Sequence, residues 1–387
     1  MRIYIQEAVR LPVGKFGGSY KDVLSQDLGA KVLRECIKRS QVNKEEIDEV
    51  IVGNIMQYDP KGNPAREASL KADIPIKIPS FTINKNCGSS MRAVTLASSL
   101  IKGGEGSIYL AAGMENMTRC PYLLRNARFG YRMGDGVISD SLTDGLVGMG
   151  LTAERLAEKY NISREEQDEF AYNSQKKAIE AAETGAFKEE LMPIKIETRK
   201  GSYVLDKDEG IKFDSSIEGL SKLKPVFKEN GTVTAGNSST INDGAAAVLV
   251  VSESALKNFQ KEPLAEILSY ASVGCDPKIM GIGPVPATRK ALKIAGLNIE
   301  DIDLIELNEA FAAQSLSVIK ELKLDMEKVN INGSGISIGH PVGATGAIII
   351  TKLAYQLKRL NKKYGLATMC IGGGQGIAIV LKNTQIK

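Results

Sequence analysis

The sequence lacks several features that would assign it to a specialised class of protein. No apolar run approaches the roughly 18 residues of a membrane-spanning helix. No block of like charge occurs, and Lys and Arg together outnumber Asp and Glu by only four, 50 against 46. Duplex nucleic acid and membrane surfaces are therefore not expected as partners. The 387 residues, 43% of them apolar, predict an ordinary soluble globular protein with two or three domains.

Cysteine is sparse, and its spacing argues against two common uses. The number is odd and no C-x-x-C pair occurs, which disfavours disulfides and a zinc site. We therefore expect a reducing compartment. Residues 1–9 alternate like a strand instead of a signal or transit peptide, and the last three residues are not a peroxisomal address, so cytoplasm is predicted. The cysteines are Cys36, Cys87, Cys120, Cys275 and Cys370.

The chain repeats itself. Residues 33–53 and 292–308 share a helix, a short turn and a strand that contains Ile-Asp, while 87–113 and 340–372 share a turn, a helix, a strand and a glycine. Chance similarity of βα units is the alternative to two related α/β halves. Alternation of apolar runs with helices favours a sheet covered by helices on both faces. The apolar runs are 108–112, 246–251, 303–307 and 377–381.

The segment between the halves differs from them in composition, because it contains polar helices and glycine-rich connections. A capping box from Ser163 to Glu166 predicts a helix that runs toward Thr184. The expected domains are an N-terminal core half over 1–118, an inserted loop domain over 119–233, the rest of the N-terminal half over 234–262, and a C-terminal half over 263–387.

The chain has a single histidine, so any imidazole chemistry must use His340. Gly339, Pro341 and Gly343 place it in a tight loop before a helix expected over 344–357, where side chains are held at a helix N-terminus. A lone histidine is more often structural than catalytic. The surrounding glycines favour the catalytic interpretation without excluding the other.

Cys87 lies between a strand expected over 80–83 and a helix that begins near Met91 and stops at Gly103-Gly104. A cysteine at this kind of turn meets the positive end of the helix dipole, which favours the thiolate. The alternative is a small buried hydrophobe, which is what most free cysteines are.

Two further motifs each allow two interpretations. Cys370 runs into Gly372-Gly373-Gly374, whose bare N–H groups either cradle an oxyanion or form a tight hairpin. Asn308 closes a strand and is either a helix N-cap or a side-chain amide at the sheet's C-terminal edge. The glycines at 333, 335 and 339, after a strand expected over 329–332, do not keep the spacing of a dinucleotide site, and no acidic residue follows about 20 positions later.

Together these motifs resemble those of the thiolase family, in the family's order and over essentially the whole chain. Cys87 carries part of the resemblance, and the other motifs are Asn308-Glu309-Ala310-Phe311, Gly339-His340-Pro341 and Cys370-Ile371-Gly372-Gly373-Gly374, supported by residues 148–154, 234–239 and 242–244.

The resemblance implies an α/β fold of two βαβαβαββ halves in a layered α-β-α-β-α core, with an inserted loop domain that binds coenzyme A, assembled as a homodimer or homotetramer. It implies that Cys87 is the acyl-accepting nucleophile and that His340 activates its thiol. Cys370 would move the α-proton. Asn308 would hold a water in one oxyanion hole, and the backbone N–H groups of Cys87 and Gly372 would form the second.

The expected reaction is the reversible condensation of two acetyl-CoA to acetoacetyl-CoA and coenzyme A, with no metal or other cofactor. Gly148 stands where some biosynthetic members have a histidine, which weakens the assignment of substrate. The alternatives are a broader 3-ketoacyl-CoA thiolase and an inactive acyl-CoA-binding relative; a ketoacyl-synthase-like enzyme commonly needs two histidines.

Five side chains are expected to bind the substrate. Met280 would narrow the acyl pocket, although a gap-filling core methionine is nearly as good an interpretation. Lys212 lies where related short-chain enzymes often place an arginine against the adenine, so stacking would be weaker. The remaining three are Met149, Ser239 and Phe311.

Overall fold

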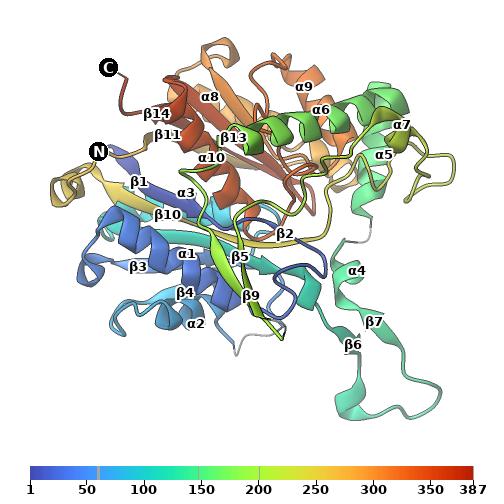
Figure 1. Ribbon diagram of the computed structural model, residues 1–387, viewed down its shortest axis with the longest axis horizontal. Helices are drawn as coiled ribbons and strands as arrows, with labels where there is room; N and C mark the ends of the chain where they lie inside the picture. The colour runs from blue at the N-terminus through green and yellow to red at the C-terminus, as the bar shows by residue number, and fades with distance from the viewer. Residues whose placement is uncertain (59–61, 147, 200, 387) are drawn as a thin grey trace.

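The computed structural model describes residues 1–58, 62–146, 148–199 and 201–386. The N-terminal half has the order βαβαβαββ, and the inserted segment precedes its last strand (Figure 1). The elements are β1 (Ile3–Arg10), α1 (Ser25–Ser40), β3 (Glu49–Gly53), α2 (Pro64–Lys71), β4 (Ser80–Ile83), α3 (Ser89–Gly103), β5 (Ile108–Asn116) and β10 (Asn242–Ser252), with β2 (Gly14–Lys15) paired to β10.

The C-terminal half repeats this order with one strand reduced to a bridge. Its elements are β11 (Ala265–Gly274), α8 (Pro284–Ala295), β12 (Leu304–Leu307), α9 (Ala312–Leu322), α10 (Thr345–Arg359), β13 (Tyr364–Ile371) and β14 (Gln375–Asn383).

The strand expected over 329–332 is wrong, because only Val329 pairs, with Ile305. Asn330 has a positive φ of 48°, and its side-chain amide bonds both the N–H and the C=O of Leu307 at 2.8 Å. The side chain of Asn330 thus takes the place of a strand partner.

The strands of the two halves form one sheet in the order β12-β13-β14-β11-β1-β10-β5-β3-β4. The two halves of the sheet join only where Tyr4 and Ile5 of β1 pair with Glu266 and Ala265 of β11. Helices α1 and α2 pack on the N-terminal half of the sheet, α8 and α9 pack with the C-terminal half, and α3 and α10 lie between (Figure 1). The predicted α-β-α-β-α layering is confirmed.

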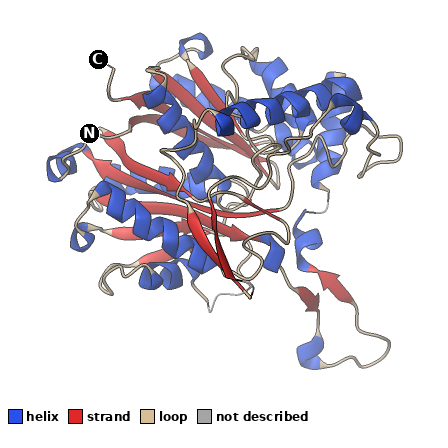
Figure 2. Cartoon of the chain, viewed as in Figure 1, coloured by secondary structure: helices blue, strands red, loops and turns tan. Residues whose placement is uncertain are grey.

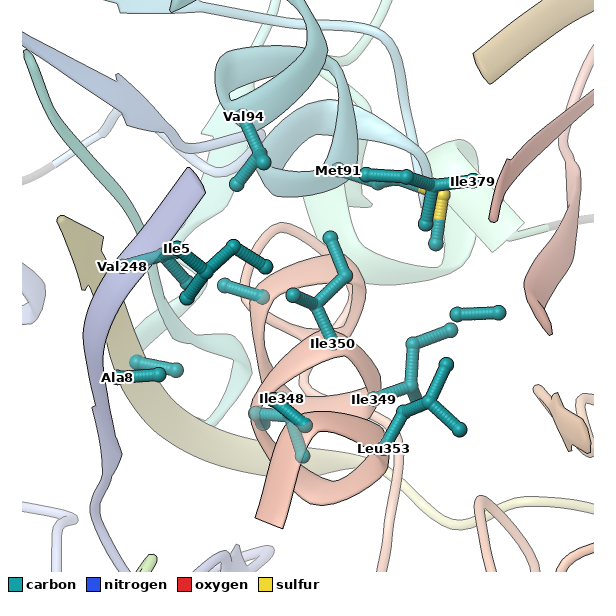
Figure 3. Close-up of a cluster of buried hydrophobic side chains, with 14 of the residues drawn as sticks. Ile5, Ala8, Met91, Val94, Val248, Ile348, Ile349, Ile350, Leu353 and Ile379 are labelled. Atoms are coloured by element: carbon teal, nitrogen blue, oxygen red, sulfur yellow. The ribbon is translucent and has the colours of Figure 1, made fainter. Parts of the chain in front are cut away.

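The two central helices explain why the core is continuous. Nearly all of α10 is buried, including Ile348, Ile349 and Ile350, as expected for a helix that is apolar on all sides. Figure 3 shows these side chains between Ile5, Ala8 and Val248 of the N-terminal strands and Ile379 of β14, with Met91 and Val94 of α3 above them. The fold therefore fixes the N-termini of α3 and α10 close to each other.

The internal duplication extends to individual side chains. Asp48 accepts hydrogen bonds from the backbone N–H groups of Ser107 and Ile108 at 2.7 and 2.9 Å, at the start of β5. Asp303 accepts the same pair of bonds from Lys363 and Tyr364 at the start of β13, both at 2.9 Å. The aspartates of the two Ile-Asp motifs therefore bind equivalent backbone positions in the two halves. The halves are related, and their similarity is not due to chance.

The segment inserted before β10 wraps over one end of the core, and its residues 122–140 extend from the core as a long arm (Figures 1 and 2). The predicted capping box is present, because Ser163 Oγ accepts from Glu166 N at 3.1 Å and Glu166 Oε2 accepts from Ser163 N at 2.7 Å. The elements are β6 (Tyr122–Leu124), β7 (Ile138–Asp140), α4 (Ser141–Leu146), α5 (Met149–Tyr160), α6 (Arg164–Glu183), β8 (Ile194–Thr198), β9 (Gly201–Leu205) and α7 (Ile217–Ser221). None of the helices that the structure describes has the length and apolarity needed to cross a bilayer.

Candidate active site

Cys87 and His340 occupy equivalent places in the two halves, just before the central helices α3 and α10. The two helix ends are in direct contact, since Ser90 Oγ accepts a hydrogen bond from the backbone N–H of Ala347 at 2.9 Å. A Cβ atom on Gly346 would collide with the backbone of Met91, so glycine is required for this approach. The duplication of the halves thus places Cys87 and His340 each just before one of two helices whose N-termini touch.

The turn that carries Cys87 is held by its own side chains. Ser89 Oγ accepts from the backbone N–H of Lys85 at 2.8 Å and donates to the carbonyl of Asn86 at 2.6 Å. Asn86 has a left-handed φ of 45°, and its side-chain amide donates to the carbonyl of Gly372 at 2.8 Å. The nucleophile turn is therefore tied directly to the glycine loop after β13.

The Cys87 thiol differs from the sequence-based expectation of a thiolate. Burial raises the pKa of the Cys87 thiol, and hydrogen bonds from the backbone N–H groups of Gly372 and of Cys87 itself only partly offset this. Desolvation thus outweighs the hydrogen bonds that favour the thiolate. The same two N–H groups are those that the sequence predicted for an oxyanion hole, and that role stays a prediction.

His340 is buried and held in one orientation. Its backbone N–H donates to Asn242 Oδ1 at 2.9 Å, and its Nδ1 lies 2.6 Å from Thr345 Oγ1. The Thr345 hydroxyl donates to the carbonyl of Pro341 at 3.0 Å. Because that hydroxyl has one proton, Nδ1 must be the donor to Thr345 Oγ1, which leaves Nε2 with its lone pair.

The surroundings of His340 keep the imidazole neutral. Burial lowers the pKa of His340 to about 4, and no carboxylate offsets this effect. Nε2 lies 3.4 Å from the side-chain nitrogen of Asn308, which follows β12. The N-cap position of α9 is Phe311, so Asn308 is not the cap, and the second of its two sequence interpretations is correct.

The glycine loop is a tight hairpin between β13 and β14, and Gly372 and Gly373 line a cavity together with Cys87. Gly373 and Gly374 have positive φ values of 88° and 85°, which a tight turn requires. Cys370 lies near the end of β13 and is almost fully buried. Burial raises the pKa of the Cys370 thiol far above its usual range, and the nearby Cys87 raises it further.

A largely apolar cavity of about 230 Å³ brings these groups together. Phe227 and Phe311 form part of its wall as a T-shaped pair with ring centroids 6.0 Å apart. The predicted residues that line it are Cys87, His340, Cys370, Met149, Ser239, Met280 and Phe311. Within the described part of the chain, no cluster of His, Cys, Asp or Glu could hold a metal ion.

The comparisons with known sequences agree with this geometry. Residues 3–254 match the family described as thiolase, N-terminal domain, and residues 261–383 match the thiolase C-terminal domain. The probable acetyl-CoA acyltransferase of Staphylococcus aureus strain COL is 51% identical over 388 residues, which cover 98% of each chain. The chain belongs to the thiolase family.

Solved thiolases have the same fold. Human mitochondrial 3-ketoacyl-CoA thiolase matches with a TM-score of 0.97 at 43% identity, covering 99% of both chains. The acetyl-CoA acetyltransferase of Bacillus anthracis matches with a TM-score of 0.96 at 44% identity, covering 99% of this chain and 98% of that one. This thiolase is therefore an acyltransferase enzyme, and the likeness to both relatives leaves the length of its acyl substrate open.

The structure also shows what the sequence motifs did not indicate in this thiolase. Phe227 comes from a polar segment with no recognisable motif, and Val342 and Thr345 gain their roles only through contacts of the His340 loop. Lys212 is exposed and does not line the cavity; its backbone N–H donates to Gln175 Oε1 at 2.9 Å.

A second cavity, of about 420 Å³, is also lined by Cys87. It shares Met149 and Val342 with the first cavity. Its other walls come from the segment after β3, the nucleophile turn, the glycine loop and the arm, including Ile55, Met56, Leu123 and Gly372. The nucleophile thus stands between two spaces.

Proposed function

We propose that this thiolase catalyses the reversible condensation of two acetyl-CoA molecules to acetoacetyl-CoA and coenzyme A through an acetyl-Cys87 intermediate. The observation that carries this proposal is the shared cavity, in which one imidazole and two sulfurs meet in apolar surroundings. Relatives named acetyl-CoA acyltransferase and acetyl-CoA acetyltransferase, and the human thiolase solved with CoA, support coenzyme A thioesters as the substrates.

In the first half-reaction, His340 Nε2 takes the proton of the Cys87 thiol as the sulfur attacks the thioester carbonyl carbon. The C–S bond to coenzyme A then breaks, and the leaving sulfur takes the proton of Cys370. This leaves acetyl-Cys87, an imidazolium and a Cys370 thiolate. The thiolate compensates the imidazolium charge, which the buried site would not tolerate alone.

In the second half-reaction, the Cys370 thiolate removes an α-proton from a second acetyl-CoA. Its raised pKa makes it a strong base for this weakly acidic proton. The resulting enolate attacks the acetyl-Cys87 carbonyl, a carbon–carbon bond forms, and the C–S bond to Cys87 breaks. The departing Cys87 sulfur takes the proton held by His340, so all three groups return to their starting states.

Oxyanions form twice in this sequence, and different donors face each. The backbone N–H groups of Cys87 and Gly372, which already point at the sulfur, are placed for the oxygen of the acyl-enzyme intermediate. Asn308, 3.4 Å from His340 Nε2, would hold a water that together with His340 faces the thioester oxygen of the enolate. Each such donor is typically worth about 10²–10³ in rate.

The proposed path of coenzyme A follows the cavity wall. Met149, Ser239 and Phe311 would contact the pantetheine arm on its way to Cys87. Lys212 lies outside the cavity on the surface, where it is free to approach the nucleotide end of the substrate.

The second candidate function is a broader 3-ketoacyl-CoA thiolase, and the second cavity favours it. A 3-ketoacyl substrate has two arms on the attacked carbonyl carbon, one leading to coenzyme A and one being the acyl chain. Cavities on both sides of Cys87 offer a place for each arm. The likeness to the human 3-ketoacyl-CoA thiolase agrees with this alternative.

The loss of acetoacetyl-CoA absorbance on addition of coenzyme A tests the proposal, with C87A as the control. A much higher kcat/KM for acetoacetyl-CoA than for longer 3-ketoacyl-CoAs supports the acetyl-specific reaction. Equal values support the broader thiolase. If no 3-ketoacyl-CoA is cleaved, the chain is the inactive relative and the proposal is wrong.

We also propose a homodimer or homotetramer that works in the cytoplasm. Large apolar side chains stand exposed on the arm, including Tyr122, Phe129 and Met133, and Cys36, Cys87, Cys275 and Cys370 are free thiols. Light scattering after size exclusion gives the mass of the assembly, and a monomer would contradict the first part. Fractionation of the source cell tests the second part.

A further inference from the structure

A buried carboxylate lies beneath the loop that carries His340. Glu115 belongs to β5, and its side chain is not exposed. Four N–H groups from two separate segments converge on it. Oε1 accepts from the side chain of Asn54 at 2.8 Å and from the backbone of Met56 at 3.0 Å. Oε2 accepts from the backbones of Ile55 and Gly343, both at 3.0 Å.

Both segments reach the active site. Ile55 and Met56 line the second cavity beside Cys87. Gly343 follows Val342, which lines both cavities, and precedes Thr345, the partner of His340 Nδ1, by two positions. A Cβ atom on Gly343 would collide with Glu115 Oε2, so the loop is pressed against the carboxylate. Glu115 thus binds both segment 54–56 and the His340 loop, which line the cavities next to Cys87.

Only the ionised carboxylate satisfies all four donors. A protonated carboxyl group carries its own proton on one oxygen, and that oxygen becomes a much poorer acceptor for its two N–H partners. In a glutamine, an NH2 group replaces one carboxylate oxygen and cannot accept hydrogen bonds. Depending on its orientation, either Ile55 and Gly343 or Asn54 and Met56 would lose their acceptor. Either change leaves buried N–H groups unpaired, which favours movement of the loops.

The balance between the two forms lies close to neutral pH. Burial raises the pKa of Glu115 to about 7, against the hydrogen bonds from Met56, Ile55 and Gly343. Asp243 on β10 raises it further, and the Cys87 thiol also senses the Glu115 charge. Burial also raises the pKa of Asp243 to about 6, against hydrogen bonds from Thr118 at 3.0 and 2.6 Å, so Asp243 loses its charge at a lower pH than Glu115.

We propose that ionised Glu115 is a positioning residue that holds segment 54–56 and the His340 loop in the arrangement the acyl transfer needs, and that its protonation slows the enzyme. The inference rests on the proposed reaction of Cys87 and His340. Protonation releases Gly343 or Ile55, and the imidazole then loses its alignment with the Cys87 thiol. The same protonation favours folding, because the folded chain holds this proton more tightly than the unfolded chain, so protonation of Glu115 does not itself unfold the enzyme.

The test compares wild type, E115Q, E115D and the control E7Q in acetoacetyl-CoA thiolysis, from two units below to two units above about pH 7. Glu7 is a buried acid of β1 that bonds Tyr355, away from the site. Wild type and E7Q should lose kcat below about pH 7. E115Q should lower kcat by about 10–100-fold, as expected for misplaced catalytic groups, change KM little and lack this pH step. E115D, still ionisable but shorter, should keep the step with a lowered kcat.

Amide hydrogen exchange gives a readout that does not need turnover. Protection of residues 54–56 and 342–345 should fall below about pH 7 in wild type, after correction for intrinsic rates, and should be low at every pH in E115Q. If wild type shows this change but has no thiolysis, the proposed function fails and the positioning role stands. An acidic step that persists in E115Q, or protection that is the same in all variants, overturns the role of Glu115.

Discussion

The Nδ1 atom of His340 lies 2.6 Å from Oγ1 of Thr345, the first residue of the helix that follows the histidine. Because the Thr345 hydroxyl donates to the Pro341 carbonyl, this contact selects the imidazole tautomer with a free lone pair on Nε2. Replacement by valine keeps the shape and removes the acceptor. We expect T345V to lower kcat by about 10–100-fold through loss of the general base.

The matched control for this prediction is T345S, which keeps the hydroxyl and removes only a methyl group. It should retain most of the wild-type kcat, and melting curves of both variants check that the fold survives. A T345V enzyme with unchanged kcat would show that the tautomer is set elsewhere.

The resting site contains a neutral thiol beside a neutral imidazole. Since burial raises the pKa of Cys87 above its usual 9.0 and lowers that of His340 to about 4, no thiolate–imidazolium pair should exist before substrate binds. The rate of Cys87 alkylation by iodoacetamide should therefore keep rising up to at least about pH 9. A rate that reaches its plateau at or below neutral pH would contradict this account.

The buried imidazole also affects stability. Its folded pKa of about 4 lies below the usual 6.5, so the unfolded chain binds this proton more readily between those values. The neutral imidazole makes its full contribution to the free energy of unfolding above about pH 6.5. This contribution decreases as the pH falls toward 4, by about 3 kcal/mol in total. H340Q should show a shallower loss of unfolding free energy over that range in denaturant titrations; an unchanged slope would contradict the shift.

Replacement of Cys370 and replacement of Cys87 should block different steps of the reaction. C370A retains the nucleophile and should still form acetyl-enzyme, but without a base it should exchange the methyl hydrogens of the second acetyl-CoA with solvent far more slowly. Deuterium uptake into acetyl-CoA measures this step. Exchange at the wild-type rate would remove the role proposed for Cys370.

Met280 offers a test of acyl-chain length, because it is buried and lines the cavity beside the reacting groups. If it narrows the acyl pocket, 3-ketohexanoyl-CoA should have a kcat/KM lower than acetoacetyl-CoA by about 10–200-fold per excess methylene, and nearer the lower end because methionine adapts. M280A should reduce the difference. M56A, which changes the second cavity instead, should not; a reversed outcome would place the chain in that cavity.

Local signals in the sequence were sufficient for the elements that frame the site. The capping residue Ser163 and the stop at Gly103-Gly104 predicted helix ends within a residue, since these ends depend on neighbouring groups alone. The family motifs also identified most of the cavity wall. Helix position alone did not indicate that burial raises the pKa of the Cys87 thiol, because that burial depends on residues far along the chain.

What the sequence did not reveal depends on contacts between distant segments. Glu115 and Gly343 are 228 positions apart, and no pattern within either segment indicates their hydrogen bond. Phe227 reaches the cavity from a loop whose polarity predicts only exposure. The choice between cap and site for Asn308 likewise required the position of His340, which belongs to another part of the chain.

The covalent intermediate on Cys87 is the central claim, and mass spectrometry tests it most directly. The enzyme is mixed with acetyl-CoA alone, quenched in acid and digested. We predict one acetyl group, located on the peptide that contains Cys87, absent in C87A and formed at least about 100-fold more slowly in H340A. An acetyl group on Cys370 or another cysteine, or turnover that persists in C87A, would contradict the account.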